Sequence, residues 1–590
     1  MKPKYLILFL LLFNIKATQA QYSFSWAKSF GSTKDDNVNT IKVDAAGNSY
    51  IFGAFQNTVD FDPGPQTHTL VSKGNWDFFI LKLNSNGDYQ WVKQIGSSTR
   101  ETPITMTTDS QFNLYISGSY STTLDFDPGP GTYTLSFSTN TLGFVGSPFI
   151  LKLDNNGNFA WVKNLPSQAF PTFLISNNDS LYFAGDFTGN CDFDPGISSY
   201  SLTSAGNGGM QSAYVCKWTN SGDFVWAISF APLINSPYIY AYSTTTNFNI
   251  NQNTLYLSFG ARGIIDLDPG PNTNTIITTS NSYTIDLFLL GLTRQGKYLN
   301  SNRWIGDRME ISQIETDKDD NKFIQLKIYN LTYTPIIIDL DPSPNVYTIP
   351  LKIGENIEYI IKLDKNFNLL WSKSLPPKIT ATPVKFAKNG FYVYGGFSDT
   401  TDFDLGPGTY TLISQNYGSG GSFIANYDYN GNLNWVYPYK INYSYNNNFY
   451  SGNISCLPDF DYGQNIYFAS NYSVSCDVNP LSIGSGTFNS TGENDFFVIR
   501  LENSLSGLKQ LNNNSQTLML YPNPTAGVFN LSAKAGMHLR VYDVNGKQVF
   551  ESLMADDLFT LDLSQLDNGL YFVNAQNAIE TRHCKLLIEK

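Results

Sequence analysis

The stretch Asp60-Phe61-Asp62-Pro63-Gly64 decides the fold, because the chain of 590 residues contains seven copies of it, some of them altered. Successive copies start 63 to 75 residues apart, and the other six begin at Asp125, Asp192, Asp266, Asp339, Asp402 and Asp477. So regular a spacing indicates one structural unit that is copied around or along an axis.

Each repeat also carries a run of mostly apolar residues, and in six repeats a polar turn and a strand with a tryptophan follow. The apolar runs are Phe79–Leu83, Phe149–Leu153, Tyr214–Trp218, Phe288–Leu292, Tyr359–Leu363, Phe423–Tyr427 and Phe497–Leu501. The turn glycines are Gly87, Gly157, Gly222, Gly296 and Gly431, and the tryptophans are Trp91, Trp161, Trp226, Trp304, Trp371 and Trp435. Two β-rich runs joined by a glycine-containing turn predict a β-hairpin.

Two more strands are predicted in each repeat, as in Thr40–Val43 and Asn48–Phe55. Four short strands per repeat are typical of a propeller blade. The seventh repeat lacks its last strand after Leu501, whereas Tyr22–Phe30 at the other end of the chain supplies a strand with Trp26 in the tryptophan position. We therefore expect an all-β fold, a seven-bladed β-propeller closed by its N-terminal strand, rather than an open solenoid with free sheet edges.

The repeats resemble the glycine-rich β-propeller repeats of secreted bacterial proteins, which carry the elements D-x-x-G-N-x-Y, D-x-F-x-x-K and G-x-x-x-W. The resemblance covers about residues 22–502 and rests, in the first repeat, on Asp44, Gly47, Asn48, Tyr50, Asp77, Phe79, Lys82, Gly87 and Trp91. It implies the fold. Propellers host binding and enzymatic functions alike, so it implies no activity.

Residues 1–20 are predicted to be a secretory signal peptide, because Lys2 and Lys4 precede the apolar run Tyr5–Phe13 and small residues follow near Ala20. That run is too short for a membrane span, which needs about 20 apolar residues. The repeats then occupy residues 21–502, and the polar stretch at 503–517 is predicted to be a linker. We expect an exported protein without a membrane span.

A separate β unit is predicted from Leu518 onward, with strands at Val528–Leu531, Leu539–Tyr542, Leu558–Leu563, Leu570–Val573 and Lys585–Ile588. Short strands separated by Gly, Asn and Asp turns predict a sandwich. Residues 518–590 resemble the C-terminal sorting domain of the type IX secretion system, on the evidence of Tyr521-Pro522-Asn523-Pro524, Val541-Tyr542-Asp543, Gly546-Lys547, Leu566 and Gly569-Leu570-Tyr571. The resemblance implies an Ig-like sandwich that is read by the outer-membrane translocon, with delivery to the cell surface or the medium.

The chain is acidic, with 37 basic and 49 acidic residues and a formal net charge of −12. This balance argues against nucleic-acid binding, which needs basic patches. Five cysteines in an exported chain suggest two local pairs, Cys191 with Cys216 and Cys456 with Cys476, which could form disulfides or remain buried thiols. Cys584 is left over, and no C-x-x-C spacing indicates zinc.

The Asp motif is the main candidate site. In an extended strand Asp60 and Asp62 point to one face and Phe61 to the other, and Pro63 with Gly64 predicts a type II turn. Two carboxylates beside a tight turn could bind Ca²⁺, although that ion takes six to eight oxygens. The candidate metal ligands are Asp60, Asp62, Asp125, Asp127, Asp192, Asp194, Asp266 and Asp268. The alternative is that these side chains accept backbone N–H groups in Asx turns.

Catalytic residues are not identified by any motif. The chain has three histidines, of which His68 alone lies in the repeats, and no G-x-S-x-G, Walker or H-E-x-x-H pattern. A glycosidase would need a carboxylate pair in one cleft. Trp76 lies outside the tryptophan positions of the repeats and could either stack on a sugar or pack in its loop.

The sequence therefore predicts an exported binding or interaction propeller without catalysis, delivered by its sorting domain. Its expected partners are the type IX translocon, through residues 518–590, and a glycan or protein ligand on the propeller. The rival hypothesis is a secreted polysaccharide-acting enzyme that uses carboxylates on the propeller face.

Overall fold

The computed structural model describes residues 22–503 and 519–588, which form strands and turns without a helix, apart from short gaps. The gaps are residues 138–145, 178, 206–209, 233–241, 252, 279–284, 306–307, 331–334, 382–383, 388–389, 415–420, 446–447, 452–455, 480–485, 522–526, 533–536, 544–546, 555–557 and 577–580. The predicted signal peptide and nearly all of the predicted linker lie outside the described residues. No helix that could cross a membrane is found in the described part of the chain. The chain divides into two compact units, Met1–Ser506 and Gly507–Lys590.

The described part of the first unit is built of antiparallel sheets, and six of its larger sheets are four-stranded. In the first repeat β2 (Asn37–Val43), β3 (Ser49–Phe55), β6 (Asp77–Leu83) and β7 (Tyr89–Ile95) pair in this order. The next sheets keep the order, with β8 (Thr102–Thr108), β9 (Leu114–Tyr120), β12 (Ser147–Leu153) and β13 (Phe159–Asn164); β14 (Ala169–Asn177), β15 (Ser180–Phe187), β18 (Ser212–Thr219) and β19 (Phe224–Phe230); β20 (Tyr242–Ile250), β21 (Thr254–Arg262), β24 (Asp286–Thr293) and β25 (Tyr298–Trp304); and β26 (Arg308–Thr316), β27 (Lys322–Tyr329), β30 (Asn356–Leu363) and β31 (Leu369–Ser374). In the sixth repeat β32 (Ile379–Ala381) and β33 (Lys385–Ala387) both pair with β34 (Gly390–Phe397), which is followed by β37 (Gly421–Tyr427) and β38 (Leu433–Tyr445).

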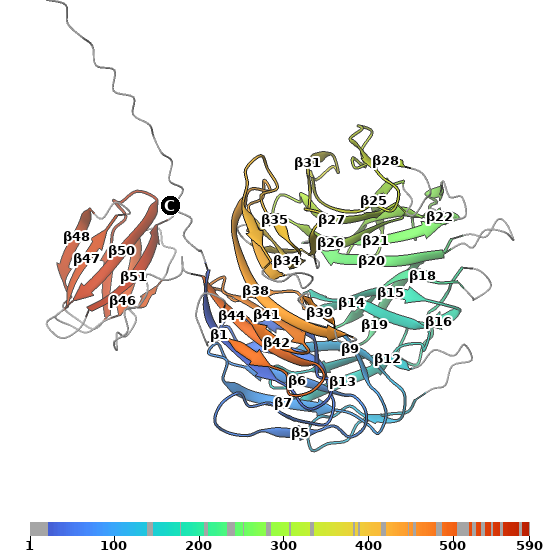
Figure 1. The fold of residues 1–590 in the computed structure, drawn as a ribbon, viewed down its shortest axis with the longest axis horizontal. Helices are drawn as coiled ribbons and strands as arrows, with labels where there is room; N and C mark the ends of the chain where they lie inside the picture. Colours follow the sequence, from blue (N-terminus) through green and yellow to red (C-terminus); the bar gives the residue numbers. More distant parts are fainter. Residues whose placement is uncertain are drawn as a thin grey trace, which may run out of the picture. The chain divides into compact units, whose positions relative to one another are not determined.

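The N-terminal strand completes the last sheet. Strand β1 (Tyr22–Phe30) pairs with β44 (Asp495–Asn503), which pairs in turn with β41 (Ile466–Tyr472) and then β40 (Asp459–Phe460). In Figure 1 the chain colours run in order around the unit from β6 through β20 to β44, and blue β1 lies beside orange β44. The predicted pairing of the first strand with the last repeat is therefore confirmed.

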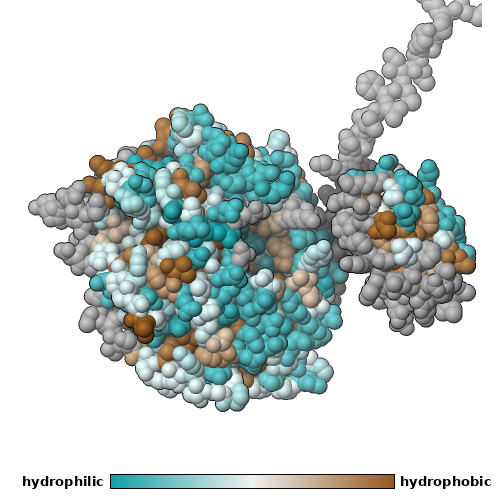
Figure 2. Space-filling view, turned by 180° about the vertical axis from the view of Figure 1, so that it is seen from behind, coloured by the Kyte–Doolittle hydropathy of each residue, from teal (hydrophilic) through white to brown (hydrophobic). Residues whose placement is uncertain are grey.

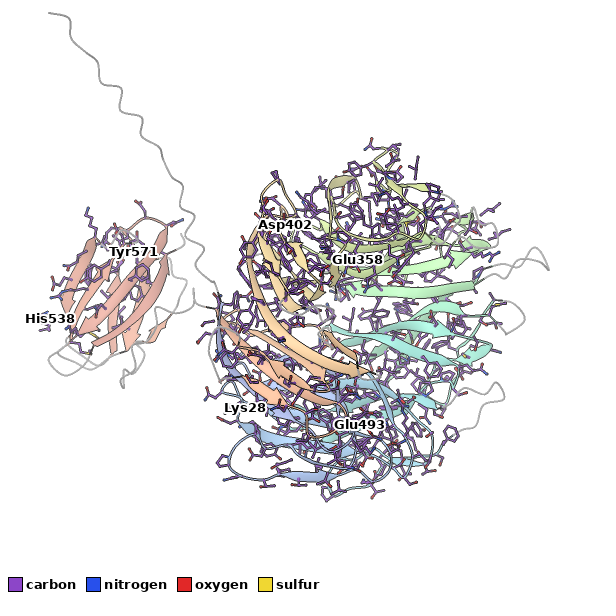
Figure 3. All side chains as sticks on the ribbon, in the orientation of Figure 1. Lys28, Glu358, Asp402, Glu493, His538 and Tyr571 are labelled. Carbon is purple, nitrogen blue, oxygen red and sulfur yellow. The ribbon has the colours of Figure 1, made fainter. Side chains whose placement is uncertain are left out.

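Side-chain contacts support this closure on both sides of the strand. The ring of Phe30 stacks on that of Phe496 with 5.1 Å between their centroids. Beyond the strand, Thr491 donates a hydrogen bond of 2.7 Å to the Ser32 carbonyl. Glu493, labelled in Figure 3, forms an exposed ion pair with Lys34, with 2.8 Å between Oε1 and Nζ. The closure therefore combines a strand pairing with apolar packing and surface contacts.

A two-stranded hairpin between the second and third strands of each repeat carries the Asp motif. These hairpins are β4 (Thr58–Asp60) with β5 (Thr69–Val71), β10 (Leu124–Asp125) with β11 (Thr134–Leu135), β16 (Asn190–Asp192) with β17 (Ser201–Thr203), β22 (Ile264–Asp266) with β23 (Thr275–Ile277), β28 (Ile336–Asp339) with β29 (Thr348–Leu351), β35 (Thr400–Asp402) with β36 (Thr411–Ile413), and β42 (Ser475–Asp477) with β43 (Thr487–Asn489). The predicted four strands per repeat miss them, because strands of two to four residues are too short to show an alternating pattern. The last hairpin also pairs with β38, which pairs with β39 (Asn448–Ser451), so the sixth sheet has eight strands.

The tryptophans and turn glycines of the repeats form the contacts between neighbouring sheets. In its own sheet Trp26 lies edge-on to Tyr467, with 6.1 Å between the ring centroids. Its Nε1 donates a hydrogen bond of 2.9 Å to the Ser85 carbonyl in the turn of the next sheet. A Cβ at Gly87 in that turn would lie 2.9 Å from the Trp26 ring, and the φ of Gly87 is 78°. This position therefore requires glycine both for its backbone conformation and for the room that the indole occupies.

The fourth repeat departs from this arrangement, and the prediction that Trp304 occupies the tryptophan position was wrong. Trp91 lies opposite Lys82 and Trp226 opposite Lys217, but the residue at this register in the fourth repeat is Asn300, opposite Gly291. Trp304 lies four residues farther along, opposite Leu287, where its side chain is buried. Counting tryptophans could not reveal this shift, because the position is defined by strand register.

The missing indole is replaced from the neighbouring repeat. Phe367 stands where other repeats have the turn glycine, with a φ of 68°. Its ring lies 6.5 Å from that of Tyr256 at an interplanar angle of 67°, as Trp226 lies 6.3 Å from Tyr182 at 60°. Lys322 of the next sheet covers both the Phe367 ring at 4.4 Å and the Tyr256 ring at 5.3 Å. Two residues of the fifth repeat thus replace the indole and the lysine that the fourth repeat lacks.

We expect Phe367→Gly to destabilise the first unit by about 2–4 kcal/mol, since it removes a buried ring while relieving an unfavourable φ. Adding Asn300→Trp should recover much of this loss, because the indole would then fill the space beside Tyr256. Chemical denaturation of the wild type, both single variants and the double variant gives the coupling between the sites. Additive effects would contradict the replacement.

The second unit consists of two antiparallel sheets around one core. One sheet has the order β45 (Met519–Tyr521), β46 (Val528–Ser532), β49 (Leu558–Asp562), and the other β48 (Gln548–Leu553), β47 (His538–Tyr542), β50 (Gly569–Gln576), β51 (Thr581–Ile588). Leu531, Leu561, Val541 and Val573 from both sheets pack in the shared core. The five predicted strands are present, and the two that the sequence analysis missed are β45 and β48.

Candidate functional site

The first aspartate of each motif is a hydrogen-bond acceptor for its own hairpin. Oδ1 of Asp60 accepts the N–H of Asp62 at 3.1 Å and that of His68, across the hairpin, at 2.8 Å. The same pair of bonds occurs at Asp125, Asp192, Asp266, Asp339 and Asp402, the last of which is labelled in Figure 3. Asp477 accepts the N–H of Asn479 at 3.1 Å. These bonds explain why the first aspartate recurs where the following proline and glycine have changed.

The second aspartate organises the turn that follows. Oδ1 of Asp62 accepts the N–H of Gly64 at 2.8 Å. The predicted type II turn was wrong, because that turn needs a positive φ at Gly64, which Gly64 does not have. A Cβ at this glycine would lie 3.0 Å from Asp62 Oδ1. The glycine leaves room for the nearby carboxylate without being required, since Ser343 keeps the same bond to Asp341 at 3.0 Å in the fifth repeat. The central residue Phe61 is fully buried as predicted.

The main argument for calcium binding was that the first aspartate recurs in all seven copies of the motif. Hydrogen bonds to the backbone explain this recurrence without a metal ion. Nowhere in the described part of the chain do three or more His, Cys, Asp or Glu side chains gather in a way that could hold a metal ion. A site made of two carboxylates and backbone carbonyls stays a prediction.

Two other sequence candidates have structural surroundings of their own. Cys191, Cys216, Cys456 and Cys476 are free, buried thiols, so the disulfide alternative is not realised. Burial raises the pKa of the Cys191 thiol to about 11, which makes it unreactive.

Trp76 is half-buried, and its backbone pairs with that of Arg100. The guanidinium carbon of Arg100 lies 5.8 Å from the centre of the Trp76 ring, which favours the loop-packing alternative.

A central cavity of about 530 Å³ lies where the first strands of successive repeats meet. Residues from β2, β8, β14, β20 and β26 line it together, so these strands lie nearest the axis of the unit. Its charged residues are Lys42, Glu315 and Lys385. Burial lowers the pKa of the Lys42 ammonium, an effect that the nearby carboxylate of Asp459 opposes. The cavity is therefore of mixed charge, and its lining combines polar side chains with apolar ones such as Ile104, Leu174 and Phe248.

A second cavity of about 850 Å³ adjoins the first and shares Ile250 and Glu315 with it. This junction pocket is lined by residues of the third, fourth and fifth repeats, namely Asn177, Ile250, Asn251, Asn253, Thr254, Arg294, Glu315, Thr316, Asp317, Lys318 and Asp320. Both volumes lie in the range of small-molecule sites, roughly 300–1,000 Å³. Because nearly all of its lining is polar, the junction pocket can form many hydrogen bonds with a ligand.

The polar groups of the junction pocket are held in place by neighbouring sheets. Nη1 of Arg294 donates to Asn177 Oδ1 at 2.9 Å. Oδ1 of Asp320 accepts from Asn251 Nδ2 at 2.5 Å and from the Tyr256 hydroxyl at 2.9 Å. The pocket is thus organised by hydrogen bonds that cross from one repeat to the next.

None of the eight predicted metal ligands lines either cavity. Sequence reasoning missed both cavities because it followed the residues that recur, whereas Arg294 and Asp320 are residues that do not. Their signal in the sequence is a charged residue at a variable turn position of the fourth and of the fifth repeat. Figure 2 shows one face of the unit, where exposed hydrophobic residues are scattered among hydrophilic ones, so no broad apolar surface competes with the cavities on that face.

Buried carboxylates lie at two neighbouring sheet junctions. Oδ1 of Asp36 accepts a hydrogen bond of 3.0 Å from the backbone N–H of Gln56. The carboxylate of Glu101 accepts hydrogen bonds from the hydroxyl and the backbone N–H of Ser97. Burial raises the pKa of Asp36 to about 7, with a further increase from Asp495. Burial likewise raises the pKa of Glu101 to about 7. Both groups are therefore more easily ionised in the unfolded chain than in the folded one.

We expect the first unit to be more stable at pH 5 than at pH 8. A raised folded-state pKa means that the folded protein binds more protons between about pH 4 and 7, so the free energy of unfolding falls as the pH rises through this window, by about 1–3 kcal/mol per group. Glu101→Gln should flatten the dependence, whereas Glu493→Gln at an exposed site should not. Thermal melts from pH 5 to pH 8 test this, and equal slopes for the wild type and Glu101→Gln would contradict it.

The comparisons with known proteins concern both units. Residues 519–589 match the family model of the secretion system C-terminal sorting domain. This domain marks proteins that the type IX system secretes to the cell surface or the medium, so the protein is secreted, and the predicted resemblance of the C-terminal end is confirmed.

An uncharacterised WD repeat-containing protein of Acanthamoeba polyphaga mimivirus is 21% identical over 493 residues, which are 71% of this chain and 34% of that protein. The chain thus spans about a third of that relative's length. Among solved structures, PorZ of Porphyromonas gingivalis, an essential bacterial surface component of the type-IX secretion system, is 9% identical with a TM-score of 0.16, covering 96% of this chain and 100% of the other. The fold assignment rests on the sheets themselves.

Proposed function

We propose that the protein is a secreted, non-catalytic binding protein whose seven-bladed propeller, at residues 21–502, holds the ligand site. In this proposal residues 1–20 are a signal peptide, 503–517 a linker and 518–590 an Ig-like sorting domain that engages the type IX translocon. Six four-stranded sheets and the eight-stranded sheet of the sixth repeat, together with the pairing of β1 with β44, support the blade count.

One observation carries the binding role. The central cavity and the junction pocket adjoin each other, and both are lined by groups that can donate or accept hydrogen bonds. Propellers bind ligands on a rigid ring of sheets, so a preformed polar pocket beside the axis is a suitable site. The carboxylates of the Asp motif accept hydrogen bonds from their own turns, which gives them a structural role. The rival enzyme hypothesis would instead use carboxylates on the propeller face, such as those of the junction pocket.

The experiment that tests this proposal incubates the full secreted chain with insoluble polysaccharides from cell envelopes, plants and algae. We expect retention of the protein on at least one of them, without release of soluble sugar. Shortened chains would favour the rival polysaccharide-acting enzyme. No retention on any polysaccharide would direct the proposal to a protein ligand, which a cross-linking experiment on living cells would then have to reveal for it to stand.

Calcium binding by the Asp motifs is tested by melting the protein in millimolar Ca²⁺ and in chelator. A ligand that binds only the folded state at a hundredfold excess over Kd adds about 2.7 kcal/mol of stability. The first four motifs, which keep both aspartates with Pro and Gly, are the expected sites. Coincident melting curves without binding heat would reduce the motifs to turn-forming residues.

A further inference from the structure

Two charged residues at variable turn positions line the junction pocket. Arg294 occupies the turn position that is Ser85 in the first repeat, because the tryptophan of the preceding sheet donates to its carbonyl in both cases. Asp320 occupies a turn position that is Gly47 in the first repeat and Phe112 in the second, and all three residues have a positive φ. Because the fold accepts different side chains at both positions, it does not require a charge at either, and both charges can serve the recognition of a ligand.

The sheet contact between the fourth and fifth repeats, next to the pocket, also has a different hydrogen-bond pattern. In the second and seventh repeats the tyrosine of the second strand donates to the aspartate of its own turn, as Tyr467 does to Asp461 at 3.1 Å. Tyr256 donates instead to Asp320 in the next sheet. Lys322, whose side chain is 1% exposed, lies 3.1 Å from Oδ2 of the same aspartate. Asp320 is thus fixed by three partners, counting Asn251, while its side chain remains 37% exposed.

The charges around the pocket balance. Among the lining residues Arg294 and Lys318 face Glu315, Asp317 and Asp320, and Lys322 adds a third cation behind Asp320. A phosphate or carboxylate ligand would meet three acidic groups, and a metal ion or organic cation would meet three basic ones. Among the described residues that line the pocket, Ile250 is the apolar one, and it offers little to a lipid or an apolar side chain. The pocket therefore suits a ligand that is polar but uncharged.

Fixed donors beside fixed acceptors match vicinal hydroxyl groups. A hydroxyl can donate to a carboxylate and accept from a guanidinium or an amide at the same time, and charged partners strengthen these bonds. Arg294 supplies such donors, Asp320 the acceptor, and asparagines on two sheets supply both. Because hydrogen bonds to neighbouring sheets already hold these side chains in place, they lose little conformational entropy when a ligand binds.

We propose that the junction pocket binds a neutral saccharide through Arg294 and Asp320. This inference rests on the proposed binding function and narrows it to one pocket and one class of ligand. It assigns no role to aromatic stacking, since the described residues that line the pocket include no aromatic side chain.

The test uses the full secreted chain and neutral trisaccharides of glucose, mannose, galactose and xylose as probes, with saturation-transfer NMR and calorimetry. At least one probe should bind. Arg294→Met should weaken that binding by about tenfold or more, because charged hydrogen bonds are lost. Lys365→Met is the matched control, since Lys365 holds the same turn position in the fifth repeat and is exposed outside the pocket. It should leave binding unchanged.

A second variant guards against misfolding. Asn253 is exposed at the rim, and Asn253→Trp should block the pocket while the melting temperature stays that of the wild type. Saccharide binding that survives both Arg294→Met and Asn253→Trp would overturn the inference and leave the proposed binding function intact. Binding of none of the probes by a protein that is retained on polysaccharide would also overturn it. Absence of both kinds of binding would overturn the inference as well, and the proposed binding function would then fail only if cross-linking on living cells revealed no protein ligand.

Discussion

Deleting Tyr22–Phe30 should abolish the monomeric first unit and produce aggregates. The deletion removes the strand that pairs with β44 over its whole length. It exposes the backbone groups of β44 as a free sheet edge, which invites pairing with other chains. It also removes Phe30 from the core that joins the first repeat to the last.

A single substitution in the N-terminal strand tests ring closure without shortening the chain. Trp26→Ala keeps the strand but removes the indole that contacts Tyr467 and donates to Ser85. We expect it to destabilise the unit by about 3 kcal/mol, since the indole is only partly buried. Lys28→Ala on the same strand should have little effect, because Lys28 makes no part of the core. Light scattering and denaturation of the three variants check these results. A deletion variant that stays monomeric with an unchanged melting temperature would contradict closure of the ring by the N-terminal strand.

The sequence predicted the parts of the fold that repetition makes visible. The strands around Trp91 and the N-terminal strand at Tyr22–Phe30 were recognisable because each apolar run recurs with the same turn chemistry. The hairpins at the Asp motif were not, since strands as short as Leu124–Asp125 show no period. The turn at Gly64 was predicted wrongly for another reason. The Asp62 side chain accepts the N–H of Gly64 and so stabilises the turn without the positive φ that a type II turn needs.

The candidate site was hidden for the opposite reason. A search for recurring residues finds the scaffold, and the Asp motif proved to be part of it through the bonds of Asp60 to Asp62 and His68. The junction pocket combines Asp317, a turn aspartate that recurs as Asp44 and Asp109, with Arg294 and Asp320, whose positions vary between repeats. These groups line one pocket because neighbouring repeats pack side by side, and their spacing in the chain does not reveal this. Charged residues at variable turn positions are therefore the better sequence signal for function in a chain of this kind.

Truncation after Asn514 should leave the first unit folded but stop its appearance on the cell surface and in the medium. The match of residues 519–589 to the sorting domain is the reason, because the translocon reads that domain rather than its cargo. Fusion of residues Gln510–Lys590 and a signal peptide to a passive cargo should conversely export the cargo in a host with a type IX system. Immunoblots of the cell fractions and the medium measure both.

The fold of the sorting domain, and not only its presence, should be required. Val541 is fully buried in β47, so Val541→Asp places a charge in the core and should block export as the truncation does. Arg540 on the same strand forms an exposed pair with Glu551, with 2.9 Å between Nε and Oε1, and Arg540→Ala should be exported like the wild type. Export of Val541→Asp at the wild-type level, or cargo that stays in the periplasm with the whole domain attached, would show that another part of the chain directs secretion.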